Sequence, residues 1–323
     1  MYSLEQLLEI CEKKIQEFKF DREPRLLYEP IEYTLAAGGK RLRPVALLMA
    51  ANMFTDDLEK AFPAAMAVEV FHNFTLLHDD IMDKADYRRS RPTVHVKWNE
   101  NIAILSGDAM LICAYRLLNQ SPEARLPQLL KTFNEFAIGV CEGQQYDINF
   151  ENAENVSMQE YIRMITMKTS VLIAGALKMG ALIGNASSEI CESLYRFGID
   201  LGIAFQIQDD LLDTYGDSKS FGKTIGGDIM VGKKTFLFIS TLEKASKEDA
   251  ERLKKLMSGN LPIAKKLPEV CAIYDKYGIQ EYTQQAINDY FDKAMSILDS
   301  LPLEKERKAP LHELSMMLLK RNK

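Results

Sequence analysis

Two short acidic motifs are the residues of this chain best suited to carry out chemistry. Residues 79–83 have the sequence DDIMD, residues 209–213 have the sequence DDLLD, and each motif follows an apolar run. Three carboxylates within five residues repel one another at pH 7, and burying any of them is costly. The sequence therefore predicts that a cation is bound at each motif.

The expected cation is magnesium. Residues four apart on a helix point the same way, so the first and last aspartates of each motif share a face. Two such helices would form an oxygen cage open on one side, which suits Mg²⁺ because this ion takes waters and substrate phosphates as further ligands. The second aspartate of each motif lies about 100° round the helix, where it would support the ligands or bind from the flank. The predicted metal-site residues are Asp79, Asp80, Asp83, Asp209, Asp210 and Asp213. The alternative is two solvated acidic helix faces, which the repetition of the motif disfavours.

Basic residues accompany the acidic motifs, as a phosphate-bearing substrate would require. They lie in GGKRLRP (38–44), in RRSR (88–91), in MKTS (167–170) and in the Gly/Lys stretch 216–234, which could close as a lid. The segment GDSKSFGKT (216–224) resembles a P-loop, but five residues separate its glycines where four are required, and no strand precedes it. A P-loop nucleotidase is therefore excluded.

Amphipathic helices are expected to position these residues. Apolar residues recur at spacings of three and four over residues 62–83, 102–119, 126–148, 158–184, 190–215 and 234–245. Alternating strand patterns and hairpin signals are nearly absent, and no Ser/Gly-rich linker divides the chain. The sequence predicts an all-α fold of roughly ten or more helices. We expect a single domain spanning residues 1–323.

Composition limits the classes of partner. The 323 residues have a net charge of −6, which argues against a surface built to bind nucleic acid or an anionic membrane. Five widely spaced cysteines without a CxxC pair favour reduced thiols in the cytoplasm. No signal peptide is expected, because the N-terminal sequence is charged and amphipathic and has no apolar core region. No transmembrane segment is expected, because the most apolar stretch, 170–184, is too short and contains Lys178.

The order of the motifs resembles that of the trans-isoprenyl diphosphate synthases, the family of the farnesyl and geranylgeranyl diphosphate synthases. The matching segments are GGKRLRP (38–44), DDIMD (79–83), RRSRP (88–92), GQQYD (143–147), MKTS (167–170), FQIQDDLLD (205–213) and GKTIGGD (222–228). This resemblance implies the isoprenoid synthase fold, which is a helical bundle around a central cleft, together with three Mg²⁺ ions and a homodimer. It also implies head-to-tail condensation of isopentenyl diphosphate with an allylic diphosphate, whether dimethylallyl, geranyl or farnesyl.

The resemblance further implies roles for individual residues. Asp79 and Asp83 would hold two ions on the allylic diphosphate and Asp209 a third, with the other three aspartates assisting. The groups that grip the allylic diphosphate would be Arg88, Lys168, Lys223 and Lys233, and those for isopentenyl diphosphate, bound without metal, Lys40, Arg43, His72 and Arg89. The Lys168 carbonyl, the Thr169 hydroxyl and the Gln206 amide would face the allylic carbocation, while closure of the 216–234 loop would exclude water.

Product length is expected to depend on the helix before the first motif. At ~1.5 Å per residue, Thr75, Phe74 and Phe71 lie about 6, 7.5 and 12 Å below Asp79. In the family, an aromatic residue at the position of Phe74 commonly forms the pocket floor, and Phe71 is the deeper candidate. These rings predict farnesyl or geranylgeranyl diphosphate, and the small Thr75 favours the latter.

Other functions on the same fold remain open at this point. A terpene cyclase usually lacks the second acidic motif and GGKxxRP, and a non-catalytic regulatory subunit is expected to have lost aspartates; this chain has them all. A longer-chain polyprenyl diphosphate synthase is a further alternative, since the short form of the first motif weakens any inference of product length.

Overall fold

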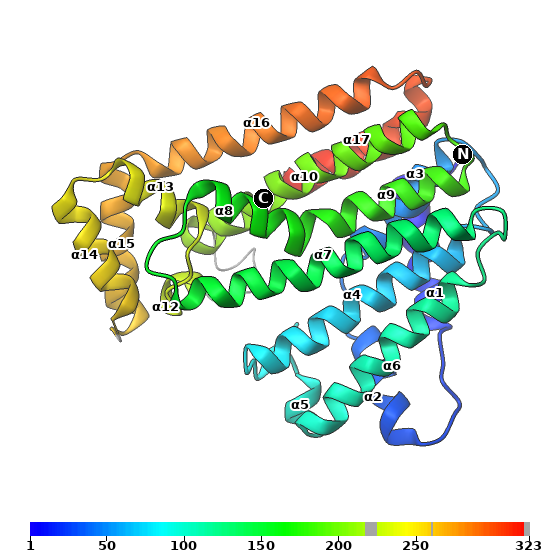
Figure 1. Cartoon of the computed structure of the whole chain (residues 1–323), viewed down its shortest axis with the longest axis horizontal. Helices are drawn as coiled ribbons and strands as arrows, with labels where there is room; N and C mark the ends of the chain where they lie inside the picture. Colours follow the sequence, from blue (N-terminus) through cyan, green and yellow to red (C-terminus); the bar gives the residue numbers. More distant parts are fainter. Residues whose placement is uncertain (217–224, 260, 320–323) are drawn as a thin grey trace. The chain divides into compact units, whose positions relative to one another are not determined.

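The structure is a computed structural model that describes residues 1–216, 225–259 and 261–319 (Figure 1). Helices dominate these residues, and their bounds follow the apolar periodicity of the sequence closely. The predicted stretch 62–83 forms α4 (Phe62–Met82), and the stretch 190–215 lies within α10 (Ser188–Tyr215). The predicted all-α class is confirmed.

The described residues divide into two compact units. Unit 1 comprises residues 1–134, 175–194 and 302–311, and unit 2 comprises residues 135–174, 195–301 and 312–323, of which 320–323 lie outside the described part. Four helices contribute residues to both units: α7 (Leu126–Asn152), α9 (Val171–Ile183), α10 and α17 (Lys305–Leu319). That the chain forms one domain stays a prediction.

Unit 1 is built around two apolar helices, α3 (Leu42–Asn52) and α4. Its remaining elements are α1 (Leu4–Gln16), α2 (Arg25–Leu35), β1 (Tyr87–Arg88), β2 (Arg91–Pro92), α5 (Val94–Lys97) and α6 (Glu100–Leu118). Helix α3 is buried on nearly every side, as expected for a helix that is apolar all round. Helix α4 packs against α3 and α6, and Gly107 of α6 allows the close approach, because a Cβ there would overlap the ring of His78. The first acidic motif thus ends a firmly packed helix.

A small hairpin follows the first acidic motif. Strands β1 and β2 pair antiparallel, with Tyr87 opposite Pro92 and Arg88 opposite Arg91. The two turn residues, Arg89 and Ser90, both have positive φ angles, 51° and 60°, as a type I′ turn requires. The sequence did not predict this hairpin, because it has neither Asn-Gly nor Asp-Gly at the turn.

Unit 2 contains the second acidic motif near the end of α10. Its other elements are α8 (Met158–Ile165), η1 (Thr166–Ser170), α12 (Gly227–Met230), α13 (Phe236–Lys244), α14 (Lys247–Ser258), α15 (Ile263–Lys276) and α16 (Ile279–Ser300). Helix α13 packs against α8, α15 and α16, and α14 lies beside α15 (Figure 1).

The MKTS motif forms a turn of π-helix. In η1 the backbone N–H of Val171 donates to the carbonyl of Thr166, five residues back. Two glycines accommodate the widened turn: a Cβ on Gly143 would lie 2.2 Å from the Lys168 nitrogen, and one on Gly202 would lie 2.7 Å from Ser170. Single π-turns inside helices occur frequently at functional sites.

Two helical stretches, Glu100–Leu118 and Met158–Ile183, are long and apolar enough to cross a membrane by length and composition. Buried helices of soluble proteins pass the same test, and most of the second stretch is buried.

Candidate active site

The first acidic motif lies at the C-terminal end of α4. The side chain of Asp79 is partly exposed, at 19%, and Asp83 is exposed at the last turn. The backbone carbonyls at a helix C-terminus already carry partial negative charge, so carboxylates there are doubly unfavourable without a cation. This location strengthens the expectation of a bound cation.

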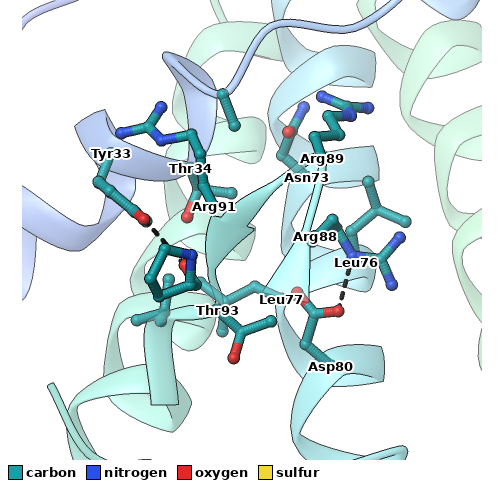
Figure 2. A pocket seen from close by; sticks show the side chains of 13 residues that line it. Tyr33, Thr34, Asn73, Leu76, Leu77, Asp80, Arg88, Arg89, Arg91 and Thr93 are labelled. Carbon is teal, nitrogen blue, oxygen red and sulfur yellow. Dashed lines mark hydrogen bonds and ion pairs between the residues drawn. The ribbon is translucent and has the colours of Figure 1, made fainter. Parts of the chain in front are cut away.

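Arg88 supplies part of the compensating charge. Its Nε donates to Asp80 Oδ1 at 2.6 Å (Figure 2), and its Nη2 lies 3.4 Å from Asp79 Oδ2. Asp80 is buried, at 5% exposure, and burial raises its pKa despite the guanidinium of Arg88. Asp80 therefore faces the hairpin, while Asp79 and Asp83 retain exposure.

The GGKRLRP loop lies against the hairpin turn. Gly38 and Gly39 have φ angles of 73° and 137°, which favour glycine, and the guanidinium of Arg89 donates to the carbonyl of Gly38. A Cβ on Gly39 would lie 2.7 Å from Arg89 Nη1. The two predicted segments for isopentenyl diphosphate, around Lys40 and around Arg89, thus contact each other.

Arg43 and His72 complete this basic cluster. Arg43 Nη1 lies 3.1 Å from His72 Nε2. A guanidinium can only donate, so Nε2 must accept and the neutral imidazole carries its proton on Nδ1. Burial, followed by the positive charges of Arg43 and Arg89, holds the pKa of His72 well below its usual value. His72 therefore stays neutral among arginines.

Arg41 lies in the same loop and bonds it to α1, α2 and α4; the sequence did not predict a role for it. It caps α3 with a φ angle of 46°, is 5% exposed, and donates to Glu69 at 2.7 Å, to Glu12 at 3.0 Å and to the Leu35 carbonyl. Its place in GGKRLRP hinted at importance. Its acidic partners lie 28 and 29 residues away in the sequence, so nothing local identified them.

Two aspartates of the second acidic motif, Asp210 and Asp213, accept hydrogen bonds from other parts of unit 2. Asp210 is 4% exposed and accepts from the Tyr161 hydroxyl at 2.6 Å and from the backbone N–H of Phe236 at 3.0 Å. Burial, and then the carboxylate of Asp228, raises the pKa of Asp210 to about 7. Asp210 therefore anchors the N-terminus of α13 to α10. Tyr161, which sequence reasoning missed, lies 49 residues away.

Asp213 holds residues 226–228 of the Gly/Lys stretch. Its side chain accepts from the Asp228 backbone N–H at 2.9 Å, and its carbonyl accepts from the Gly226 N–H at 2.6 Å. Asp209 is half-buried, on the same helix face four residues earlier.

Two predicted lysines share one carboxylate in unit 2. Lys168 Nζ lies 2.6 Å and Lys233 Nζ 4.0 Å from Asp147 Oδ2. Burial acts to raise the pKa of Asp147, but the ammonium groups of Lys233 and Lys168 together lower it below its usual value. Asp147, the last residue of GQQYD, thus orients both lysines. Beside them, the Thr169 hydroxyl donates to Gln206 Oε1 at 3.1 Å. Lys223 lies outside the described residues.

Two of the three predicted chain-length residues, Phe71 and Phe74, belong to a cluster of aromatic rings in unit 1. Phe71 is 1% exposed, and its ring centroid lies 5.6 Å from that of Phe74 and 5.3 Å from that of Phe133 on α7. Phe74 and Thr75 are half-buried, one turn closer to the acidic motif. Phe71 therefore lies behind Phe74 in the core, backed by a ring that the sequence did not indicate.

The carboxylate donors of both motifs suit a hard divalent cation. Within residues 1–216, 225–259 and 261–319, no three His, Cys, Asp or Glu side chains come together to hold a metal ion by themselves. This arrangement is compatible with magnesium, which keeps several waters and takes substrate phosphates as ligands.

Comparison with known proteins identifies the family. The sequence pattern of the polyprenyl synthetases matches residues 24–274. This chain belongs to the polyprenyl synthetase family. It is 44% identical to a geranylgeranyl diphosphate synthase of Methanosarcina mazei over 70% of each chain, and 38% identical to one of Saccharolobus solfataricus over 93% of this chain and 91% of that protein. A crystal structure of a geranylgeranyl pyrophosphate synthase superposes with a TM-score of 0.95, at 43% identity over 100% of both chains.

Two further polyprenyl synthetase relatives bear on product and metal. A geranylfarnesyl diphosphate synthase of Aeropyrum pernix is 35% identical over 84% of this chain and 86% of its own. A geranylgeranyl pyrophosphate synthase of Corynebacterium glutamicum, complexed with isoprenyl diphosphate and magnesium, has a TM-score of 0.90 at 26% identity, covering 99% of this chain and 100% of its own. The predictions of the isoprenoid synthase fold and of a short-chain trans-prenyltransferase are confirmed.

Proposed function

We propose that this enzyme condenses isopentenyl diphosphate with an allylic diphosphate, head to tail, to form geranylgeranyl diphosphate. The observation that carries the proposal is the divergence of two neighbouring arginines. Arg88 pairs with the first acidic motif, whereas Arg89 bonds the GGKRLRP loop beside Arg43 and His72. One turn therefore serves two anion-binding groups, as an enzyme with two diphosphate substrates needs and a terpene cyclase does not.

The allylic diphosphate is assigned to the acidic motifs and the lysines. Three Mg²⁺ ions, on Asp79, Asp83 and Asp209, would neutralise the diphosphate and polarise its oxygens as it leaves. Arg88, Lys168 and Lys233 donate hydrogen bonds to the departing group, and Lys223 is assigned the same role from the sequence. Asp80, Asp210 and Asp213 assist by holding Arg88, α13 and the residue 226–228 segment in place.

Isopentenyl diphosphate is assigned to the basic cluster of unit 1. Lys40, Arg43 and Arg89 supply charge without a metal, and the neutral imidazole of His72 limits repulsion among the arginines. The positive charge of this cluster matches a diphosphate that must remain bound through the reaction.

The bond changes follow from these assignments. The C1–O bond of the allylic substrate breaks, and the diphosphate departs with the electron pair. The Lys168 carbonyl, the Thr169 hydroxyl and the Gln206 amide present dipoles to the carbocation, and the π-turn η1 is held in register by Gly143 and Gly202. The terminal alkene carbon of isopentenyl diphosphate attacks C1, which leaves a cation on its methyl-bearing carbon, C3. The released diphosphate then takes a proton from C2, and the new double bond forms between C2 and C3.

The control of product length is assigned to the rings of Phe74 and Phe71. The half-buried Phe74 forms the floor, and Phe71 with Phe133 closes the space behind it. Phe74→Ala should add at least one isoprene unit to the main product, and Thr75→Phe should shorten it. An unchanged product distribution in both variants would assign the floor to another helix.

A second copy of the chain is the expected partner. Ile104, Leu105 and Ile112 on α6 are 43%, 59% and 60% exposed, and a surface of that kind usually meets another protein. We assign it to the homodimer contact. Ile112→Glu should lower the molar mass in light scattering to that of one chain, and an unchanged mass would exclude this face. The free thiols, of which Cys11, Cys113 and Cys191 are buried, support a cytoplasmic location.

The proposal is tested with isopentenyl and dimethylallyl diphosphates, with and without Mg²⁺. We expect release of diphosphate only with the metal and with both substrates present, and a C20 product on chromatography. Turnover of an allylic diphosphate alone would indicate a cyclase, and a C25 main product would place the enzyme with the geranylfarnesyl synthases.

A further inference from the structure

The β1–β2 hairpin is too small to hold its own shape. It has two residues in each strand, and even longer isolated hairpins are marginal in water. Its turn places Arg89 and Ser90 at positive φ without a glycine or asparagine. Arg88 and Arg91 are cross-strand partners, and like charges directly opposite are destabilising. Contacts with other elements must therefore fix the hairpin.

Tyr33 of α2 provides such contacts to strand β2. Its hydroxyl donates to the Pro92 carbonyl at 2.8 Å, and the guanidinium carbon of Arg91 lies 4.0 Å from its ring centroid. Figure 2 shows Tyr33 and Arg91 on the side of the hairpin away from Asp80. The guanidinium of Arg91 thus packs on the Tyr33 ring, and that of Arg88 pairs with Asp80. Each of the two arginines that repel each other across the strands is therefore stabilised by a partner outside the hairpin.

Lys97 and Trp98, which follow the hairpin in the sequence, also contact the Tyr33 ring. Lys97 Nζ lies 4.0 Å from the centroid of the Tyr33 ring and 4.5 Å from that of Trp98. The rings of Tyr33 and Trp98 meet edge to face at 5.3 Å. We call Tyr33, Arg91, Lys97 and Trp98 the Tyr33 clamp.

We propose that the Tyr33 clamp positions Arg88 and Arg89 for the two diphosphates. The inference rests on the proposed function only in assigning those anions. Arg88 and Arg89 are adjacent in one tight turn, so a displacement of β2 moves both guanidinium groups. Tyr33 and Arg91 are positioning residues, which act through these two arginines without contacting substrate.

The expected size of the effect follows from population arithmetic. If only a fraction of molecules has the hairpin in place, the apparent dissociation constant rises by the inverse of that fraction. Tyr33 makes two contacts with the hairpin, the cation–π contact with Arg91 and the hydrogen bond to the Pro92 carbonyl. Loss of both corresponds to an affinity change of about tenfold. Tyr33→Phe keeps the ring and loses only the bond to Pro92, so a change of about threefold is expected.

The chain offers its own reporter and a matched control. Trp98 is the only tryptophan of the 323 residues, so its emission and its quenching by acrylamide report on the clamp alone. Tyr282→Leu is the control, because Lys244 Nζ lies 3.1 Å from the Tyr282 ring centroid in a similar pair on α13 and α16.

The experiment compares the full-length wild type with Tyr33→Leu, Tyr33→Phe, Arg91→Leu and Tyr282→Leu. Binding of inorganic diphosphate is measured by calorimetry with Mg²⁺ present, together with the KM for each substrate. For Tyr33→Leu we expect about tenfold weaker diphosphate binding, stronger Trp98 quenching, and KM values that rise together for both substrates by more than kcat falls. Arg91→Leu should show the same pattern more weakly, and Tyr282→Leu should match the wild type.

The contradicting results are equally definite. A folded Tyr33→Leu variant with wild-type diphosphate affinity would overturn the proposal, as would a rise in KM for one substrate alone. If Tyr33→Leu does not fold, wild-type affinity in both Tyr33→Phe and Arg91→Leu would overturn it. Calorimetry needs no turnover, so a clamp effect on diphosphate binding would stand even if the proposed condensation were absent.

Discussion

The two acidic motifs have the same spacing and lie in similar places, near the C-terminal ends of α4 and α10. Among the described residues, the two motifs receive hydrogen bonds from different kinds of donor. In the first motif, the buried aspartate pairs with the guanidinium of Arg88, brought by the hairpin that follows α4. In the second, Asp210 and Asp213 accept from neutral donors, including the Tyr161 hydroxyl and the backbone N–H of Asp228.

This difference separates roles that the shared pattern does not. With a cationic partner, we expect the first motif to exchange contacts when a charged substrate binds. Neutral donors from α8, α12 and α13 tie the second motif to its surroundings, so two of its three aspartates maintain structure. In both motifs the second aspartate is buried, at 5% exposure for Asp80 and 4% for Asp210, and it holds a neighbouring segment of the protein in place.

The largest expected effect is loss of a metal ligand. Asp79→Ala or Asp209→Ala should lower kcat by at least about 10³-fold, because the charge of the leaving diphosphate is no longer offset. The free energy of unfolding should stay the same or increase slightly, since a repelling carboxylate is removed. Steady-state kinetics and denaturant unfolding check both statements. Activity within tenfold of the wild type in either variant would remove that aspartate from the metal site.

Asp210 should respond in the opposite way. Asp210→Ala leaves the Tyr161 hydroxyl and the Phe236 N–H buried without their acceptor and should cost about 2–4 kcal/mol in unfolding free energy. Asp210→Asn keeps an acceptor oxygen and should cost less than half of that. At the first motif, Asp79→Asn and Asp79→Ala should instead be equally inactive and equally stable. Similar behaviour of the two motifs in this set would abolish the distinction between them.

Substrate-specific changes in KM sharpen the comparison further. Arg43→Ala should raise the KM for isopentenyl diphosphate about tenfold or more, with a smaller change for the allylic substrate, because a charge-assisted hydrogen bond is lost. Lys233→Ala should do the reverse. Equal effects of each variant on both substrates would show that the two anion groups are wrongly assigned.

The smallest effect concerns the neutral His72. Its pKa is depressed in the folded protein, whereas an unfolded imidazole titrates near 6.5. Below that pH the unfolded chain binds a proton that the folded protein does not, so the free energy of unfolding falls by at most about 1.4 kcal/mol per pH unit. His72→Gln should remove this part of the loss between about pH 6.5 and 5.5. Identical pH dependence in the variant and the wild type would mean that His72 titrates normally.

The sequence predicted the helices well because their apolar periodicity is strong, as in α4 and α10. The 100° step between neighbouring helical residues also separated Asp80 and Asp210 from the other aspartates, and the structure buries both. The hairpin escaped prediction because two-residue strands show no alternation and Arg89-Ser90 is not a turn signal. The Tyr161, Arg41 and Tyr33 contacts join residues 28 to 59 positions apart, where sequence spacing has no influence.

Location of the metal ions tests the central distinction most directly. Crystals of the full-length protein would be grown with Mn²⁺ and a non-hydrolysable allylic thiodiphosphate, and the ions located by anomalous scattering. We predict ions on the carboxylates of Asp79, Asp83 and Asp209, with Asp210 still bonded to Tyr161 and the Phe236 N–H. An ion coordinated by Asp210, or a bound thiodiphosphate with no ion on Asp79, would contradict the account.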